Sequence, residues 1–292
     1  MSEDLLAVER ERRRREREEH RQRPAHSNRR RLLVGGLLTF AALGVAAIAA
    51  LAYRHFHRST PPPVVLKTII VTIPEGYTRS ETARLAGEDG LTGSYMAASR
   101  GHEGFLFPDT FELDRHAAAA ELVRRQLEDF KQRTKGVDLA YARSKNLTLR
   151  DVVTIASMIE HEAATEKDRP LVAAVIYNRL HEGMPLGIDA TIRFATGNYT
   201  QPLTESELAV ESPYNTRTHA GLPPGPIDSP GLAAIEAAAH PAKVDYLFYV
   251  TKPGTCGGLA FAATEAEFEE DAARYDSARE AAGGNSPDTC GE

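Results

Sequence analysis

The apolar positions of the chain first follow a strand-like pattern and then a helical one. Val64 to Ile73 is rich in β-branched residues, which favours a strand. Ser80 to Leu91 has the spacing of a short helix, and Gly104 to Phe111 reads as an aromatic loop or strand. Ala117 to Lys135 predicts a long, charged helix. This β/α region is too small to bury a large core alone, so we expect it to pack on the helices beyond residue 147.

From about Leu147 the apolar residues recur at intervals typical of packed helices. Thr148 followed by Asp151 predicts a capping box, at the start of a helix that ends near Ala164. Pro170 suits the first turn of a second helix, which Gly183 is expected to end.

The last part of the chain predicts two more helices and a hairpin. Ser229-Pro230-Gly231 has the pattern of a helix start, with the helix reaching about Ala239. Tyr246 to Val250 and Leu259 to Ala262 predict a pair of strands, and a final helix is expected from about Thr264. The predicted fold class is α+β, mostly helical, with a small β-hairpin.

Leu32 to Tyr53 contains no charged residue and predicts a single N-terminal transmembrane helix over residues 32–53. As a helix this run would be about 33 Å long, enough to cross the core of a bilayer. A cleavable signal peptide is the alternative, because Ala50-Leu51-Ala52 resembles a cleavage site. The apolar part of a signal peptide is usually shorter and nearer the terminus, which favours the retained anchor.

The charges that flank this run predict its orientation. Residues 1–31 hold eleven arginines, so we expect them to form a charged cytoplasmic tail. The protein is then a single-pass protein of the cell membrane, with a linker at 54–66 and the rest of the chain extracytoplasmic. Residues 281–292 are expected to be a loose tail.

Charge and cysteine content exclude several classes of function. The arginines of the N-terminal tail alternate with glutamates, and residues 32–292 hold 24 Lys and Arg against 34 Asp and Glu, a net charge of −10 that argues against a nucleic-acid partner. Cys256 and Cys290 both fall where a disulfide is permitted, but the sequence does not show that they pair. No metal and no cofactor are expected.

Two glutamates border the apolar stripe of the helix that ends near Ala164. At 100° per residue, Glu162 falls beside Ile155 and Ile159, and Glu160 falls on the opposite border. Half-buried placement would raise the pKa of such a carboxyl, as a general acid working near neutrality requires. The same pattern also fits two ordinary exposed residues at the border of the apolar stripe. The helical geometry does not show which of the two glutamates would be the acid.

Two familiar hydrolase motifs are incomplete. His161-Glu162 begins the zinc-protease motif His-Glu-x-x-His, but Thr165 stands where the second histidine would be. No Gly-x-Ser-x-Gly elbow presents a serine nucleophile.

Further polar residues are candidates for binding a substrate. Asn178 and Arg179 lie among apolar residues of the second helix, either on the surface or in a cleft. Asp189 follows a glycine-containing turn, where an aspartate often serves as a helix cap. The triplet of Tyr214, Asn215 and Thr216 precedes a rigid Gly-Leu-Pro-Pro-Gly loop, which suits the presentation of hydrogen-bonding groups to a sugar or a structural turn.

These segments resemble the YceG-like family of endolytic murein transglycosylases over roughly Leu147 to Tyr275. The similar segments, in the order of the family, are IASMIEHEA, VAAVIYNRL, GMPLGID, YNTRTHAGLPPGPI, SPGLAAIEAAAHPA and YLFYV, with GFLFPDTF upstream.

The resemblance implies a bacterial lyase that cuts nascent peptidoglycan strands internally, leaves 1,6-anhydro-N-acetylmuramic acid ends and thereby terminates glycan polymerisation. It implies that Glu162 is the catalytic acid and base, and that Glu160, Asn178, Arg179, Asp189, Tyr214, Asn215 and Thr216 serve substrate binding. It implies a truncated LysM-like module with a connecting helix at 67–146, and a catalytic domain at 147–280. Cell-wall synthases are implied as partners.

Three positions depart from the family pattern. Gly187 and Ile188 stand where a glutamine and a small hydroxyl residue are usual, and Leu259 replaces a histidine. These departures motivate an alternative function, a membrane-anchored peptidoglycan-binding or scaffold protein without catalysis. True hydrolysis, with a reducing-end product, is a third possibility.

Overall fold

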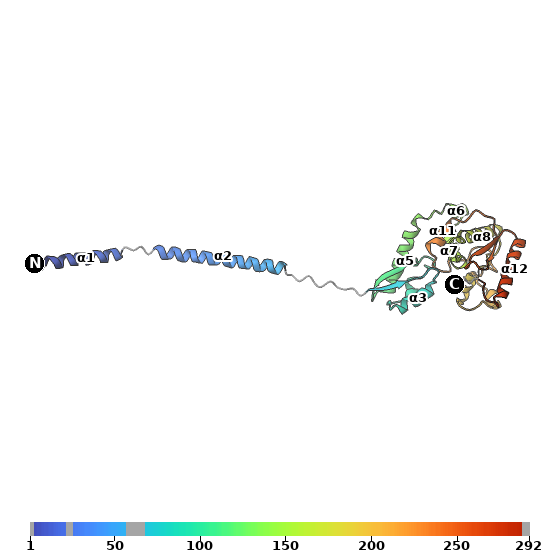
Figure 1. Cartoon of the computed structure of the whole chain (residues 1–292), viewed down its shortest axis with the longest axis horizontal. Coiled ribbons are helices and arrows are strands. Elements are labelled where there is room, and N and C mark those ends of the chain that lie inside the picture. Colours follow the sequence, from blue (N-terminus) through green and yellow to red (C-terminus); the bar gives the residue numbers. More distant parts are fainter. Residues whose placement is uncertain (1–2, 22–25, 57–67, 288–292) are drawn as a thin grey trace. The chain divides into compact units, whose positions relative to one another are not determined.

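The structure is a computed structural model of the 292-residue chain, and it describes residues 3–21, 26–56 and 68–287 (Figure 1). Within these ranges, side chains are described for residues 8–18, 40–56 and 68–287. The chain divides into two compact units, Met1–Val65 and Leu66–Glu292, which are considered separately.

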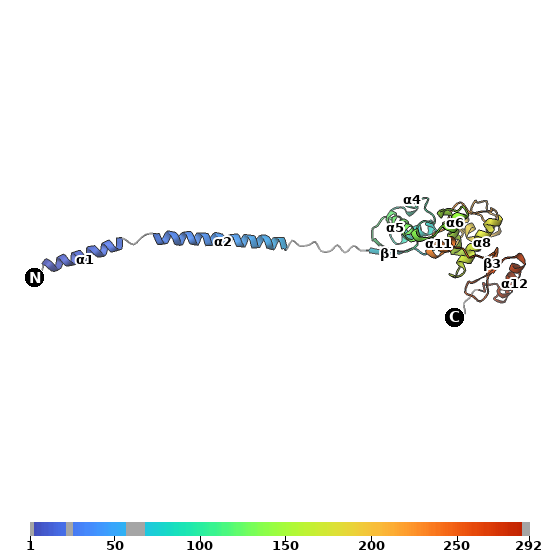
Figure 2. The same cartoon turned by 90° about the horizontal axis from the view of Figure 1, so that it is seen from above.

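The first unit contains two helices, α1 (Glu3–Arg21) and α2 (His26–Phe56) (Figures 1 and 2). In α1 the alternating charges pair one turn apart, with Arg12 3.5 Å from Glu16 and Arg13 3.6 Å from Glu9. The exposed side chains of α2 include large apolar ones such as Phe40 and Leu43.

Within the described part of the chain, no helix is at once long enough and apolar enough to cross a bilayer. The side chains of residues 32–39, the first part of the expected 32–53 span, lie outside the described residues, as do residues 57–66 of the expected linker.

The second unit begins with a small β/α region. It consists of β1 (Thr68–Thr72), α3 (Arg79–Glu88), α4 (Tyr95–Ala98), β2 (Thr110–Asp114) and α5 (Ala119–Arg133). The strands are antiparallel, so Val71 lies opposite Phe111. Apolar residues of these five elements and their loops form a core of their own, which includes Val71, Ile73, Leu106, Phe111, Leu113 and Leu122. The expected strand and helices are confirmed here, except that residues 64–67 lie outside the described residues.

The larger core lies around α7 (Leu149–Glu162), α8 (Arg169–Glu182) and α11 (Leu232–Ala239). The capping box at the start of α7 is confirmed, since Thr148 and Asp151 bond to each other's backbone N–H. Gly183 ends α8 with a φ of 67°, as predicted. Phe107 and Phe130, from the β/α region, are part of this larger core, and residues 66–292 form one compact unit.

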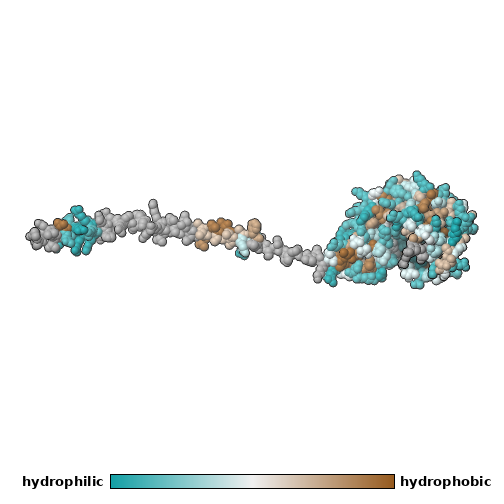
Figure 3. Space-filling view, in the orientation of Figure 1, coloured by the Kyte–Doolittle hydropathy of each residue, from teal (hydrophilic) through white to brown (hydrophobic). Residues whose placement is uncertain are grey.

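A hairpin and a last helix complete the unit. β3 (Phe248–Thr251) and β4 (Leu259–Ala262) are antiparallel, and α12 (Glu265–Ala281) packs on them through Phe268, whose ring is 5.3 Å from that of Phe248. The mixed α/β fold with small antiparallel strand pairs is confirmed, with about half of the chain helical. The face of this unit drawn in Figure 3 is mostly hydrophilic, with apolar side chains in small patches.

Six elements were not predicted or differ from the prediction. The unpredicted ones are α4, the 3₁₀ turn Thr134–Gly136, α6 (Ala140–Ser144), α9 (Asp189–Thr196) and α10 (Glu205–Leu208). The predicted start of α11 was wrong: the cap is Gly231, and Ser229 instead exchanges backbone hydrogen bonds with Gly76 and Tyr77, both at 3.0 Å. This pairing ties the β/α region to the loop before α11.

Candidate active site

Glu162 is the last residue of α7 and borders a cavity of about 450 Å³. The helix ends there, so the side chain lies at the edge of the core and is partly buried. The cavity is lined by residues from several parts of the fold: Glu81, His161, Glu162, Asp189, Ala190, Arg193, Phe194, Tyr199 and Ile227.

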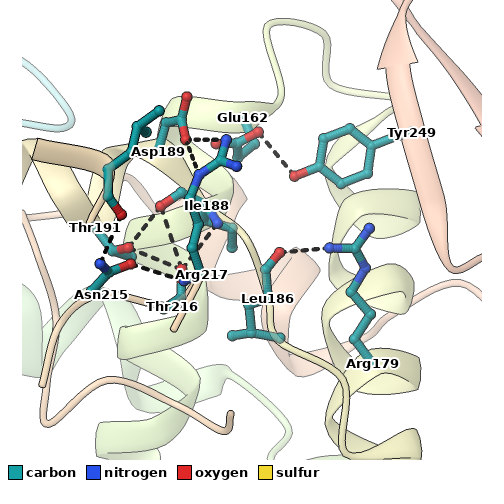
Figure 4. Close-up of polar contacts among 11 residues, drawn as sticks. Glu162, Arg179, Leu186, Ile188, Asp189, Thr191, Asn215, Thr216, Arg217 and Tyr249 are labelled. Atoms are coloured by element: carbon teal, nitrogen blue, oxygen red, sulfur yellow. Dashed lines mark hydrogen bonds and ion pairs between the residues drawn. The ribbon is translucent and has the colours of Figure 1, made fainter. Parts of the chain in front are cut away.

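The Glu162 carboxyl has one hydrogen-bond donor from the hairpin. The hydroxyl of Tyr249, on β3, donates to Glu162 Oε2 at 2.9 Å (Figure 4). Burial raises the pKa of Glu162, with a further rise from nearby Asp189, while the Tyr249 bond and the charges of His161 and Arg179 oppose that rise. The carboxyl is therefore held in place and more readily protonated than an exposed glutamate.

Glu160 lies on the other side of α7, as the helical wheel predicts. Its Oε2 accepts a hydrogen bond from the backbone N–H of Gly231 at 3.0 Å, at the start of α11, and Arg169 lies 4.0 Å away. Burial raises its pKa too. Glu160 does not line the Glu162 cavity.

Asp189 lines the same cavity as Glu162, and both appear in Figure 4. Its Oδ1 accepts from Nε and Nη2 of Arg217 at 2.9 and 2.7 Å. Asp189 is the first residue of α9 and not its cap, which is Ile188.

The triplet before the proline–glycine loop is turned inward. Asn215 and Thr216 are buried. The Asn215 amide donates to the carbonyls of Leu208 and Val210, and the Thr216 hydroxyl accepts from the N–H of Ile188 at 3.0 Å. Thr216 thus fixes the start of α9 and with it Asp189.

Tyr214 packs against Phe194, with ring centroids 4.8 Å apart. Since Phe194 lines the cavity, Tyr214 supports the wall from behind.

Asn178 and Arg179 connect α8 to the hairpin. The Asn178 amide donates to the carbonyls of Val244 and Tyr246, both at 2.9 Å. Arg179 donates to the carbonyl of Leu247 at 2.6 Å and to that of Leu186 at 2.7 Å. The Arg179 guanidinium thereby holds the residue before β3 and the turn before Asp189 to the same helix. Figure 4 shows its bond to Leu186.

The structure also describes Gly187, Ile188 and Leu259, the three residues that depart from the family pattern. Ile188 is buried in the larger core. Gly187 has a φ of 68°, and the N–H of Leu259 donates to Asp168 Oδ2 at 3.2 Å.

The sequence analysis did not identify Glu81, Arg193 and Tyr199, which line the cavity. It also did not identify Asp228 and Tyr249, which contact the lining residues His161 and Glu162. Tyr249 was recognised only as part of an aromatic strand. Glu81 comes from α3, more than seventy residues before Glu162, and its position next to a glutamate of α7 follows from tertiary packing alone. Among the described residues, no group of three or more histidine, cysteine or acidic side chains is arranged to hold a metal ion.

The chain is similar to proteins of known name. The chain is 31% identical over 257 residues to the endolytic murein transglycosylase of Streptococcus pneumoniae R6, covering 74% of this chain and 46% of that protein. It is 33% identical over 178 residues to the protein of the same name from Bacillus subtilis 168, covering 61% of this chain and 49% of that protein. The chain thus spans about half the length of the curated relatives it matches.

A solved structure is similar as well. The crystal structure of a yceG-like protein from Listeria monocytogenes matches with a TM-score of 0.58 and 28% identity, covering 69% of this chain and 75% of that one. The model of the YceG-like family matches residues 46–274, most of the chain. The chain therefore belongs to the YceG-like family.

Proposed function

We propose that this protein is an endolytic lytic transglycosylase that cuts nascent peptidoglycan strands and leaves 1,6-anhydro-N-acetylmuramic acid ends. The observation that carries the proposal is Glu162, a partly buried carboxyl with a raised pKa at the edge of a cavity of about 450 Å³. Relatives that match this region are named endolytic murein transglycosylases.

In the proposed reaction, protonated Glu162 donates its proton to the glycosidic oxygen that leaves the muramic acid, and the bond from the anomeric carbon to that oxygen breaks. The C6 hydroxyl oxygen of the same muramic acid bonds to the anomeric carbon and closes a 1,6-anhydro ring. Its proton passes to the Glu162 carboxylate, so the acid is regenerated and no water is consumed.

This reaction needs only one carboxylate. A glycoside hydrolase normally uses two, because the second activates water or attacks the sugar. Here the nucleophile is part of the substrate, and its proximity replaces that activation. Asp189, one of two other acidic residues that line the cavity, accepts two hydrogen bonds from Arg217, which suits substrate binding better than the role of a general base.

The seven residues proposed to serve glycan binding differ in whether they line the cavity or support the elements around it. Of the seven, Asp189 alone lines the cavity in the described structure. The α9 side of the cavity is supported by Tyr214, Asn215 and Thr216. The hairpin is bonded to Asn178 and Arg179 of α8, and the start of α11 is bonded to Glu160.

For the whole protein we propose a single-pass anchor at residues 32–53, with the N-terminus in the cytoplasm and the catalytic domain outside the cell membrane. The uncharged run and the arginines before it support this topology. Residues 67–146 would serve as a truncated LysM-like module that contacts glycan, and cell-wall synthases would be partners that supply nascent strands.

The decisive experiment treats purified peptidoglycan with the wild-type protein, with Glu162→Gln and with Glu160→Gln, and analyses the products by mass spectrometry. We expect anhydro-muramic acid ends from wild type and from Glu160→Gln, and none from a folded Glu162→Gln. Undiminished product from Glu162→Gln would overturn the assignment of the acid. Reducing-end muramic acid would indicate hydrolysis, and binding without new ends would indicate the scaffold alternative.

A further inference from the structure

A histidine–aspartate pair lies beside Glu162. His161 precedes Glu162 on α7 and lines the same cavity, and its Nε2 is 2.8 Å from Oδ2 of Asp228. Asp228 belongs to the loop before α11, and its side chain is 0% exposed, whereas that of His161 is 41% exposed. Asp228 is thus fully buried, whereas His161 is partly exposed at the cavity.

The negative charge of the buried Asp228 carboxylate is stabilised by its contact with His161. Within the described residues, neither of its carboxylate oxygens forms a hydrogen bond of good geometry, so the 2.8 Å ion-pair contact is its compensating interaction. A buried carboxylate without hydrogen bonds is costly unless a positive charge lies against it. Burial raises the pKa of Asp228 to about 6, and the carboxylate in turn raises the pKa of His161. A protonated imidazole is the form that satisfies Asp228.

Most of the other charged residues around the pair are acidic. They are carboxyls from three elements: Glu160 and Glu162 on α7, Glu81 on α3, and Glu103 in the loop before β2. The basic residues nearby are Arg79, beside Glu103, Arg169, beside Glu160, and Arg193, in the cavity lining. A mostly acidic environment favours an imidazolium over a neutral ring.

A protonated His161 has a second donor. Nε2 faces Asp228, and the structure gives Nδ1 no partner among the described residues. An imidazolium donates from both nitrogens, so Nδ1–H remains for an acceptor other than Asp228. Three acidic residues line the cavity, Glu81, Glu162 and Asp189, against one arginine, Arg193, so a neutral carbonyl oxygen fits better than a carboxylate.

We propose that His161, held by Asp228, is a positioning residue that donates from Nδ1 to an acetamido carbonyl of the glycan bound against Glu162. The proposal rests on peptidoglycan being the substrate. It assigns Asp228 no contact with the sugar: its part is to fix the ring and keep it protonated. Binding should then weaken as the pH rises through the pKa of His161, because Nδ1 loses the donated proton.

The test measures binding separately from cleavage. The full chain carrying Glu162→Gln, which stops turnover, is titrated with a peptidoglycan tetrasaccharide bearing its peptide stems, from pH 5.5 to 9. In this background His161→Ala should weaken binding about tenfold at pH 5.5, the effect expected for one charge-assisted hydrogen bond, and should remove most of the pH dependence of binding. His240→Ala, an exposed histidine at the end of α11, is the matched control and should leave the Kd unchanged.

Asp228→Asn tests the pairing. Removing the carboxylate lowers the pKa of His161, so the loss of binding should occur at a lower pH than in the parent. An unchanged Kd in His161→Ala, or an unchanged pH dependence in Asp228→Asn, overturns the proposal. If Asp228→Asn does not fold, His161→Ala decides alone. Cleavage by the chain with Glu162 intact is scored separately, so normal binding behaviour without anhydro ends would count against the proposed function and not against this pair.

Discussion

The hydroxyl of Tyr249 donates to Glu162 Oε2 at 2.9 Å, although the two residues are 87 positions apart. The hairpin thus reaches across to the end of α7 and fixes one oxygen of the carboxyl, leaving the other for substrate. A donor to this oxygen favours the carboxylate, and burial favours the acid. The two effects together suit a group that must both give and take a proton.

Tyr249→Phe should slow formation of anhydro ends about tenfold, since roughly 1.4 kcal/mol of positioning by one hydrogen bond is lost. The same change raises the pKa of Glu162, so the alkaline decline of the pH–rate profile should move to higher pH. Tyr246→Phe, whose ring stacks on Phe261 in the same hairpin, is the control. A Tyr249→Phe profile that coincides with wild type would show that the bond does not act on Glu162.

Glu160→Ala should affect stability and leave the chemistry intact. The change removes the acceptor of the Gly231 N–H and should lower the free energy of unfolding by about 1–3 kcal/mol, the cost of an unsatisfied buried donor. Urea denaturation gives that quantity, and mass spectrometry checks that anhydro ends still form. Loss of product with full stability would instead place Glu160 in direct contact with the glycan.

The parts of the fold that sequence predicts are those with local signals. Thr148 and Asp151 cap α7 from three residues apart, and Gly183 ends α8 through its own backbone conformation. Such features depend on neighbours along the chain, so a single sequence contains them in full.

The active site is different, because its geometry depends on distant segments. The wheel places Glu160 and Glu162 on opposite borders, and the structure agrees, but no local pattern tells which border faces a cavity. Ser229 had the pattern of a helix cap and pairs with Tyr77 instead, because strand-like pairing to the β/α region was stronger than the local preference. The partnership of Thr216 with Ile188 is equally invisible to local patterns.

Arg179 should matter for stability through its shape as well as its charge. Its planar guanidinium donates to the carbonyls of Leu247 and Leu186 at the same time. The ammonium of a lysine is a single compact group and cannot reach both acceptors. Arg179→Lys should therefore lower the free energy of unfolding by about 1–3 kcal/mol. Arg274→Lys, on the exposed face of α12, should change it by less than about 0.5 kcal/mol. Equal effects in urea denaturation would refute the bridging role.

Gly104 allows close packing between the β/α region and the proline–glycine loop. Its φ is +83°, and an added Cβ would overlap the ring of Pro226 and crowd Val153. Gly104→Ala should destabilise by about 2–4 kcal/mol, from overpacking together with the strain of a left-handed backbone. Gly90→Ala isolates the backbone contribution, because Gly90 has a φ of +81° and open space around it. If thermal unfolding shifts equally in both variants, the clash with Pro226 contributes nothing.

Glu103 should make stability fall as the pH rises. Burial raises its pKa to about 7 in the folded protein, against 4.5 for the free side chain. Between these two values the folded state retains a proton that the unfolded state has lost, so stability present below pH 4.5 declines up to about pH 7. Glu103→Gln cannot ionise and retains an oxygen that can accept from the N–H of Arg79, as Glu103 does at 2.9 Å. The variant should therefore be more stable than wild type at pH 8, by at most about 3 kcal/mol, and the difference should shrink towards pH 4.5.

Glu112→Gln, on the exposed face of β2, is the control, and unfolding free energies across this pH range provide the measurement. Parallel curves for Glu103→Gln and wild type would mean that the Glu103 carboxyl ionises at the same pH in the folded and the unfolded chain.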